Sequence, residues 1–261
     1  MTPRSAVKCS VFLTSLIFAS CHAAAKDAPC RDVEFQTDRF TVCQFSTSGS
    51  DVRIFWGDGD TAYGQFDVLS RVLDSRETHL LFAMNAGMYH KDRLPVGLYI
   101  DSDGQRRGLQ IKESVGNFGM LPNGVFHISA AGIGVTETKT FKARQLSPKY
   151  ATQSGPMLVI DNHIHPRFNV DSTSKRIRNG VGVSADGGTV YFSISEKPVN
   201  FFKFASLFKD ELQTPNALYF DGVVSRLFDA ASGRNDLGMA MGPIVAVVET
   251  DAAGPDKESE K

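Results

Sequence analysis

Residues 216–228 read NALYFDGVVSRLF, near the C-terminus of the chain. The run Ala217–Phe220 is apolar and predicts a buried β-strand. It stops at Asp221-Gly222, a pair typical of turns. An aspartate there either starts an ordinary turn or is held at a functional site, because loops that follow strands often carry functional groups. The surrounding sequence helps to choose between these two interpretations.

The residues before this strand have the period of an amphipathic helix. In residues 200–212, NFFKFASLFKDEL, four apolar side chains share one helical face and Asn200 is a suitable N-cap. Residues 65–75, QFDVLSRVLDS, show the same period. Apolar runs predict further strands at Val52–Trp56, Leu80–Met84, Val96–Ile100, Val125–Ser129, Met157–Ile160, Val181–Ser184, Val190–Ile194 and Ile244–Val248. Since strands outnumber helices and do not alternate regularly with them, we predict an α+β fold, a β-rich single domain of mixed sheets with a few packed helices.

Length and composition agree with one globular domain. The chain has 261 residues, of which 42% are hydrophobic and 22% charged, so it is long enough to bury a sizeable core. The formal net charge is −1, and no basic excess indicates a nucleic-acid partner. No repeat or linker divides the chain, so the domain is assigned to residues 30–249.

The first 25 residues have the layout of a secretory signal peptide. Arg4 and Lys8 precede the short apolar stretch 11–20, and small residues ending at Ala25 suit cleavage. That stretch is too short to span a membrane, and no other run is long enough. We therefore predict a periplasmic or secreted protein, with a lipid anchor at Cys21 as the alternative. The polar tail, residues 250–261, is predicted to be disordered.

Two cysteines remain beyond the predicted signal, Cys30 and Cys43. They flank an alternating stretch that predicts a hairpin turning at Thr37-Asp38. Because exported proteins meet oxidising conditions, a Cys30–Cys43 disulfide is predicted. The alternative is a metal-binding pair, but no second Cys/His pair at suitable spacing accompanies it.

Familiar nucleotide-binding, serine-hydrolase and zinc-protease motifs are absent. Residues 101–113 begin like a calcium loop, but Arg106 and Lys112 stand where glycine and glutamate are needed, which favours a hairpin turn. His163 and His165 would share one face of a strand. Two histidines alone do not make a zinc site, so a surface turn is favoured there.

Polar residues beside glycines follow or precede several apolar strands. Asn85, Gly87 and Tyr89 lie just after the strand at 80–84, where glycine lets a backbone approach a ligand and Asn85 offers both donor and acceptor. Ser154 and Gly155 lie just before another strand. Ordinary turns and strand starts explain these residues equally well, and both interpretations stay open at this point.

Two arginines lie just before the strand predicted at 181–184. Arg176 and Arg178 are two residues apart, so in an extended chain they share a face. A guanidinium group can bind phosphate in a bidentate manner. The alternative is a solvated basic turn, which these residues alone favour.

Six stretches with such residues follow one another along the chain: MNAGMY (84–89), GNFGMLPNGVF (116–126), ATQSGPMLV (151–159), RIRNGVGVS (176–184), PVNFFKFASLFKDEL (198–212) and NALYFDGVVSRL (216–227). In order and spacing they resemble the phosphodiester glycosidase domain family, which includes the uncovering enzymes, and within it the bacterial YigE-like branch. The resemblance extends roughly from Cys30 to Val248. It implies a secreted or periplasmic α+β domain that hydrolyses a sugar-1-phosphate diester in an envelope or extracellular glycan.

The resemblance also implies a site. Residues 85–89 match the family's NGG-aromatic turn, 154–156 its SGP segment, Arg178 with Val181-Gly182 its arginine before a strand, and Asp221-Gly222 with Ser225 its DGGGSS-like loop. Two departures stand out. Ala86 replaces a glycine, and Val223-Val224 stand where the uncovering enzymes have small residues, so the loop after Asp221 is more apolar here.

On this resemblance, Arg178 with Arg176 would stabilise the departing phosphate. Asp221 would act as nucleophile or general base, with Glu196 as the candidate second carboxylate. The alternative role for Glu196 is charge matching at the N-terminus of the following helix. No cofactor is required, with calcium bound by Asp221 and carbonyl groups as the alternative. The residues expected to bind substrate are Asn85, Gly87, Tyr89, Ser154, Gly155, Arg176 and Ser225.

A second interpretation belongs to another class of function, a non-catalytic periplasmic protein that binds a glycan or a phosphate-bearing envelope polymer. The valines after Asp221-Gly222 favour it, because they change the loop that should hold the substrate. The sequence indicates neither the sugar nor the oligomeric state.

Overall fold

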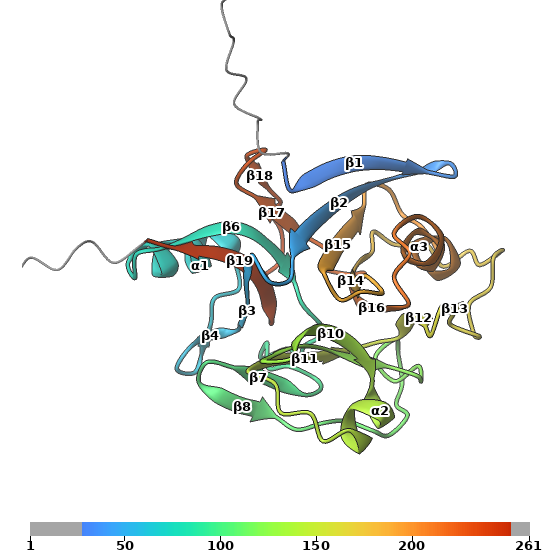
Figure 1. Ribbon diagram of the computed structural model, residues 1–261, viewed down its shortest axis with the longest axis horizontal. Helices are drawn as coiled ribbons and strands as arrows, with labels where there is room; N and C mark the ends of the chain where they lie inside the picture. The colour runs from blue at the N-terminus through green and yellow to red at the C-terminus, as the bar shows by residue number, and fades with distance from the viewer. Residues whose placement is uncertain (1–27, 252–261) are drawn as a thin grey trace, which may run out of the picture.

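The described part of the protein, residues 28–251 of a computed structural model, consists of three β-sheets, a small ribbon and a few helices (Figure 1). Every pairing among these strands is antiparallel. The β-rich character and the small number of helices agree with the predicted fold. The predicted signal peptide, the Cys21 alternative and all but the first two residues of the predicted tail lie outside the described residues.

The first sheet contains the stretch that ends in Asp221. Its seven strands lie in the order β1 (Cys30–Phe35), β2 (Asp38–Ser46), β15 (Thr189–Ser195), β14 (Asn179–Val183), β16 (Asn216–Asp221), β12 (Met157–Ile160) and β13 (His163–Ile164). The hairpin of β1 and β2 turns at residues 36–37, one residue earlier than predicted. Its two strands are joined by the predicted Cys30–Cys43 disulfide.

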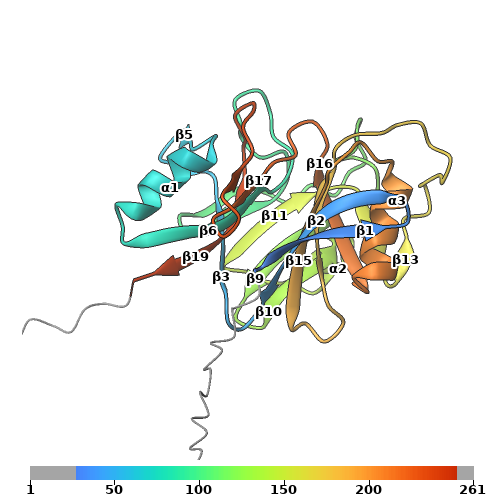
Figure 2. The same ribbon diagram turned by 90° about the horizontal axis from the view of Figure 1, so that it is seen from above.

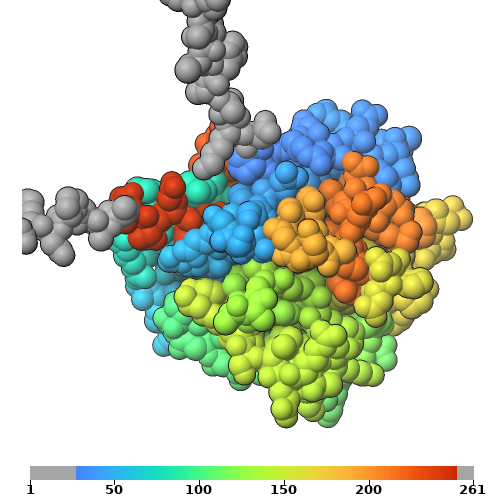
Figure 3. All heavy atoms as spheres, in the orientation of Figure 1, coloured from blue at the N-terminus to red at the C-terminus, as the bar shows by residue number. Residues whose placement is uncertain are grey.

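Two five-stranded sheets complete the fold. One has the order β10 (Gly132–Glu137), β9 (Gly124–Ser129), β11 (Tyr150–Ser154), β7 (Tyr99–Asp101) and β8 (Gly104–Arg107). The other has the order β18 (Arg234–Asn235), β17 (Leu227–Asp229), β6 (Thr78–Asn85), β19 (Ile244–Thr250) and β3 (Asp51–Phe55), and β4 (Gly57–Asp58) pairs with β5 (Thr61–Ala62) in the ribbon. On the face shown in Figure 3, the residues of the three sheets pack closely against one another.

The predicted helices form where the apolar period placed them. Helix α1 (Phe66–Asp74) lies along β6 at one end of the molecule, and α3 (Phe201–Ser206), continued by the π-helical turn η1 (Leu207–Glu211), lies at the other (Figure 2). Asn200 caps α3 by accepting a hydrogen bond from the Lys203 amide at 2.9 Å, as predicted. Helix α2 (Thr138–Ala143) was not predicted, since six residues are too few to show a helical period. No helix between residues 28 and 251 is long and apolar enough to cross a membrane.

The main core lies where the three sheets meet. Phe82 from β6 packs against Phe192 from β15 with ring centroids 5.0 Å apart, and Phe126 from β9 packs against Phe192 at 5.9 Å. Phe220 of β16 joins this group through Phe126 at 6.2 Å. Aromatic pairs at such distances add to the stabilisation from apolar burial. The residue before Asp221 is therefore fixed in the centre of the core.

Candidate functional site

Two buried asparagines connect the ends of β6 and β14. The side-chain amide nitrogen of Asn179 donates to the side-chain oxygen of Asn85 at 3.0 Å and to the backbone carbonyl of Asn85 at 2.9 Å. The Asn85 amide donates in return to the side-chain oxygen of Asn179 at 3.2 Å. Buried amides are stable only when their donors and acceptors are paired, and these two satisfy each other. This reciprocal pair links the first sheet to the third.

The same pair fixes the loop that follows β16. The side-chain oxygen of Asn179 accepts from the Asp221 amide at 3.1 Å, and that of Asn85 accepts from the Arg226 amide at 2.9 Å. Between these two anchors, the Ser225 hydroxyl lies 2.8 Å from the Asp221 carbonyl oxygen. Asn85 and Ser225, both predicted to bind substrate, therefore hold the backbone around Asp221 in this structure.

Asp221 is buried at the end of β16, with 8% of its surface exposed. Its Oδ1 accepts hydrogen bonds from the Gly222 amide at 2.6 Å and from the Val223 amide at 3.0 Å. Among the described residues, Oδ2 has no hydrogen-bond partner. Burial raises the pKa of this carboxyl, and the backbone amides oppose that rise. The result is an aspartate with one oxygen fixed and the other unoccupied.

Asp221 lines a pocket of about 840 Å³. Four segments distant in sequence form the pocket, and Asp221 is the one acidic residue in its lining. The Tyr89 hydroxyl donates to the Ala240 carbonyl at 2.9 Å across one wall, and burial followed by the charge of Asp221 raises the pKa of Tyr89. The lining residues are Met88, Tyr89, His90, Arg93, Val96, Ser114, Val115, Gly116, Asn117, Phe118, Asp221, Val223, Val224, Met239 and Ala240.

Arg178 is buried, 1% exposed, and does not line this pocket. Its guanidinium carbon lies 3.6 Å from the centre of the Phe201 ring, while Nε donates to the Val199 carbonyl at 2.8 Å and Nη2 to the Ser174 carbonyl at 3.0 Å. Within residues 28–251 it forms no ion pair, and Nη1 has no hydrogen-bond partner. Burial lowers the pKa of Arg178. The Phe201 and Tyr219 rings and two carbonyl oxygens offset part of the cost of burying this cation.

The space between Arg178 and the Asp221 loop is filled by Tyr219. The Tyr219 hydroxyl is buried and lies beside the Arg178 guanidinium group. A side chain at Gly222 would collide with this hydroxyl, so only glycine fits beside Tyr219 at that position. The electrostatic influence of Arg178 lowers the pKa of Tyr219, but burial is the larger effect and raises it above its ordinary value. Arg178 thus lies behind the Asp221 loop, with Tyr219 between them.

The other predicted substrate-binding residues lie around this centre without lining the pocket. Arg176 is exposed and donates to the adjacent Lys175 carbonyl at 2.8 Å. The Ser154 hydroxyl donates to the Phe220 carbonyl at 3.0 Å inside the core. Gly155 and Gly87 are places of close packing, since an added Cβ would lie 2.6 Å from Asn123 Cβ and 3.1 Å from Thr152 Oγ1, respectively. Their roles in substrate binding stay predictions.

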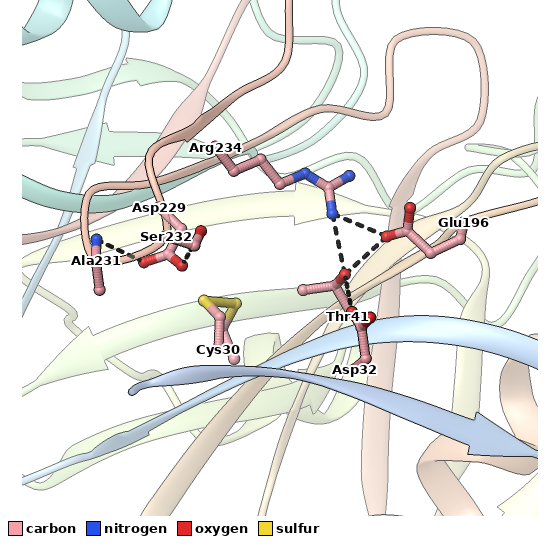
Figure 4. The surroundings of a disulfide bond; sticks show 9 residues. Cys30, Asp32, Thr41, Glu196, Asp229, Ala231, Ser232 and Arg234 are labelled. Atoms are coloured by element: carbon pink, nitrogen blue, oxygen red, sulfur yellow. Dashed lines mark hydrogen bonds and ion pairs between the residues drawn. A yellow bond between two sulfur atoms is a disulfide. The ribbon is translucent and has the colours of Figure 1, made fainter. Parts of the chain in front are cut away.

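Glu196 lies elsewhere, near the disulfide (Figure 4). Its Oε1 accepts from the Thr41 hydroxyl at 2.7 Å and from Arg234 Nη1 at 2.8 Å, and it does not line the pocket of Asp221. The alternative role at a helix N-terminus does not fit either, because α3 begins at Phe201 and is capped by Asn200. The catalytic role of Glu196 stays a prediction that this placement does not favour.

The described residues contain no group of three or more histidine, cysteine or acidic side chains placed to hold a metal ion. Of the two histidines near β13, His163 is exposed and His165 is buried against Phe168. Asp101 ends β7 and residues 104–107 form β8, and these two strands make the hairpin expected there in place of a calcium loop.

Sequence reasoning missed two residues of this region. Asn179 was obscured because an Asn-Gly pair is typical of a turn, whereas Asn179 opens a central strand. Arg93 follows the 84–89 motif by four residues and shows no signal of its own in the sequence. Only the fold brings it to the pocket that Asp221 lines.

Comparisons with known proteins show the family of the chain. The family model described as phosphodiester glycosidase matches residues 78–240, which include the turn at Asn85, Arg178 and Asp221. The uncharacterised protein YigE of Escherichia coli (strain K12) is 31% identical over 219 residues, covering 84% of each chain.

Solved structures with this fold include the catalytic domain of zebrafish N-acetylglucosamine-1-phosphodiester alpha-N-acetylglucosaminidase, auto-inhibited by its pro-peptide. It is 14% identical with a TM-score of 0.58, and the match covers 84% of this chain and 81% of that one. A protein of Burkholderia pseudomallei matches with a TM-score of 0.51 at 9% identity, over 80% of this chain and 74% of that one. These two likenesses concern the fold, whereas the family model and the bacterial relative establish that the chain belongs to the phosphodiester glycosidase family.

Proposed function

We propose that this protein is an exported hydrolase that cleaves the bond between a sugar and a phosphodiester, with Asp221 as its reactive carboxylate. The observation that carries the proposal is convergence. The segments 88–96, 114–118 and 221–224, which include parts of three motifs shared with the family, surround one pocket. Within it, Asp221 has one oxygen fixed by backbone amides and one unoccupied.

The chemistry follows from that geometry. Hydrolysis breaks the bond between C1 of the sugar and the phosphate oxygen, and the phosphate monoester leaves with the bonding electrons. Asp221 Oδ2 either attacks C1 directly, after which water hydrolyses the glycosyl ester and frees the carboxylate, or it takes a proton from the water that attacks C1. Its raised pKa keeps it a stronger base than an exposed aspartate. A phosphate is a good leaving group, so no strong general acid is needed.

Positive charge is needed where the phosphate departs. Arg93 lines the pocket directly and forms no ion pair with any described residue. Arg178 is buried behind Tyr219 and does not line the pocket, so its positive charge would act on a bound phosphate from a distance. We propose that Arg93 meets the phosphate at the pocket and that Arg178 supports the site from behind it.

Export is part of the same proposal. The Cys30–Cys43 disulfide is stable in an oxidising compartment, and the N-terminal sequence has the layout of a secretory signal. The proposed location is the periplasm or the exterior of the cell. The proposed substrate there is a sugar-1-phosphate diester of an envelope or extracellular glycan.

The test is hydrolysis by the purified protein of UDP-N-acetylglucosamine and of simple alkyl esters of sugar 1-phosphates, with sugar and phosphate products both quantified. Asp221→Asn should lower kcat/KM at least about 10⁴-fold, because it removes the attacking or proton-accepting oxygen. Asp210→Asn, at an exposed aspartate paired with Lys209, is the matched control and should keep full activity. Equal rates for wild type and Asp221→Asn would reject the assignment.

Two further arms separate the alternatives. Binding without turnover that is lost in Arg178→Ala but kept in Asp221→Asn would indicate a non-catalytic binding protein. Treatment with EDTA should leave the rate unchanged, because the proposed chemistry uses no metal. A rate that falls with EDTA and returns with added calcium would support the calcium alternative at Asp221.

A further inference from the structure

The rim of the Asp221 pocket is unusually apolar for a site that should take a sugar phosphate. Val115, Val223 and Met239 line it with 100%, 75% and 62% of their surfaces exposed. Among the described residues, seven large hydrophobic side chains are exposed, and three of the seven line this pocket. Isolated exposed apolar residues are ordinary, but a group of them around a pocket indicates a binding surface.

The three side chains come from separate loops. Val115 belongs to the segment 114–118, Val223 follows Asp221, and Met239 lies in the loop before β19. Leu237, two residues before Met239, is also 84% exposed. Because tertiary folding alone brings these loops together, the apolar rim is a property of the pocket and not of one sequence run.

The polar and apolar parts of the pocket are arranged around one carboxylate. Asp221 is followed by Val223 and Val224 in the lining, while His90 and Arg93 come from another segment, residues 88–96. Deeper apolar residues, Met88, Val96 and Phe118, continue the apolar lining from the rim. A ligand that fills this volume of about 840 Å³ must therefore present an anion to the basic residues and an apolar group to the valines and the methionine.

We infer that the substrate is an amphiphile, a sugar phosphodiester whose second alcohol carries an alkyl chain, and that Val115, Val223 and Met239 bind this chain. This inference rests on the proposed function, and it specifies the alcohol that leaves with the phosphate. Val223 and Val224, which depart from the uncovering-enzyme pattern, would then enlarge the apolar surface next to the reacting bond. The phosphate lies between the chain and the sugar, within reach of the pocket's basic residues.

The test measures binding separately from turnover. The probes are the methyl and octyl esters of a non-hydrolysable C-phosphonate analogue of N-acetylglucosamine 1-phosphate, kept below their micelle concentrations, with Kd measured by calorimetry on the wild-type protein. Burial of one methylene strengthens binding about fourfold, from about 0.8 kcal/mol, so burial of even two gives a preference of more than tenfold for the octyl ester. We expect at least that ratio.

Variants then locate the preference. Val223→Ser with Met239→Ser should reduce the octyl-to-methyl ratio by at least about fivefold, because a serine cannot replace the lost apolar contact. Val170→Ser changes an exposed valine, 54% accessible, that does not line the pocket, and it should leave the ratio unchanged. Thermal unfolding of each variant confirms that it is folded.

The outcomes separate this inference from the proposed function. Equal Kd values for the two esters, no binding of either, or a preference that survives in the double serine variant would overturn the inference. Failure of the wild type to hydrolyse either phosphate ester would reject the proposed function, while a chain-length preference on the phosphonates would still support an amphiphilic ligand. Hydrolysis of the methyl and octyl phosphate esters, together with equal Kd values for the two phosphonates, would keep the function and overturn the inference.

Discussion

Asp221 is the last residue of β16 and Glu196 directly follows β15, so both lie where neighbouring strands of one sheet end, yet their surroundings differ. Both β15 and β16 pair antiparallel with β14, so their C-terminal ends lie on either side of Arg178 and Asn179. Glu196 ends in an ion pair with Arg234, whereas Asp221 has only backbone donors and an unoccupied oxygen. A carboxylate whose charge is neutralised by a protein cation holds structure together, and one that lacks such a partner in a pocket remains available for chemistry.

The largest effect should come from the residue that positions Asp221. Asn179→Ala removes the oxygen that accepts from the backbone amide of Asp221. It also removes the acceptor of the Asn85 side-chain amide and the side-chain donor to the Asn85 backbone carbonyl. Unpaired buried groups each cost about 1–3 kcal/mol, so we expect a loss of about 4 kcal/mol in the free energy of unfolding. Urea unfolding measures it, and kcat/KM should fall as Asp221 loses its position.

The matched control is Asn235→Ala on β18, an exposed asparagine, for which we expect a change within about 0.5 kcal/mol. If Asn179→Ala were no more damaging than Asn235→Ala, the asparagine pair would not hold the site, and the contrast between the two carboxylates would need another explanation.

Removal of the Cys30–Cys43 disulfide tests the region around Glu196. Replacing Cys30 and Cys43 by alanine opens a loop with a sequence separation of 13 residues, and it should cost about 3 kcal/mol in the chain-entropy model. Because the disulfide lies near Glu196 and away from the pocket, kcat/KM below the melting temperature should stay within about twofold of wild type. Thermal unfolding and steady-state rates measure the two quantities. A large loss of activity in the folded variant would connect the Glu196 region to the chemistry.

Glu196→Gln should have a smaller effect. The ion pair with Arg234 is partly exposed, with about a third of the Glu196 side chain accessible, so its loss should cost about 1 kcal/mol. Arg234 keeps its second acid, Asp236, at 3.0 Å. Activity should stay within about twofold. A loss of 100-fold or more with the fold intact would restore Glu196 as the second catalytic carboxylate.

Local patterns in the sequence predicted most of the fold. Met157–Ile160 was predicted to the residue, and the helix at 65–75 was located, because apolar period and flanking turns are local signals. The predicted strand at 96–100 becomes regular only from Tyr99, since Pro95 and Gly97 shape its beginning. Helix α2 was missed because six residues are too few to show a helical period, and β10 because its sequence GIGVTE has only two large apolar residues.

The site was predictable only in part. A buried strand ending in Asp221 is visible in the sequence, and so is the turn at Asn85. Which side chains face the pocket depends on tertiary packing. Arg93 and Met239 reach it from separate loops, whereas Ser154 turns into the core. The partner of Glu196, Arg234, is 38 residues away, a distance over which local patterns carry no information.

The smallest effect should distinguish the ionisation of Asp221 from its role in catalysis. Burial raises its pKa, so the native state binds this proton more tightly than the unfolded state. The stabilisation from that proton is complete below the unfolded pKa, about 4, and is lost as pH rises through the folded pKa. Asp221→Asn cannot ionise and still offers an oxygen to the Gly222 amide. Relative to wild type, it should therefore gain Tm between pH 4 and pH 7.5. An Asp221→Asn variant whose Tm falls further below wild type as pH rises would mean that the carboxylate is stabilised by its backbone donors more than burial disfavours it.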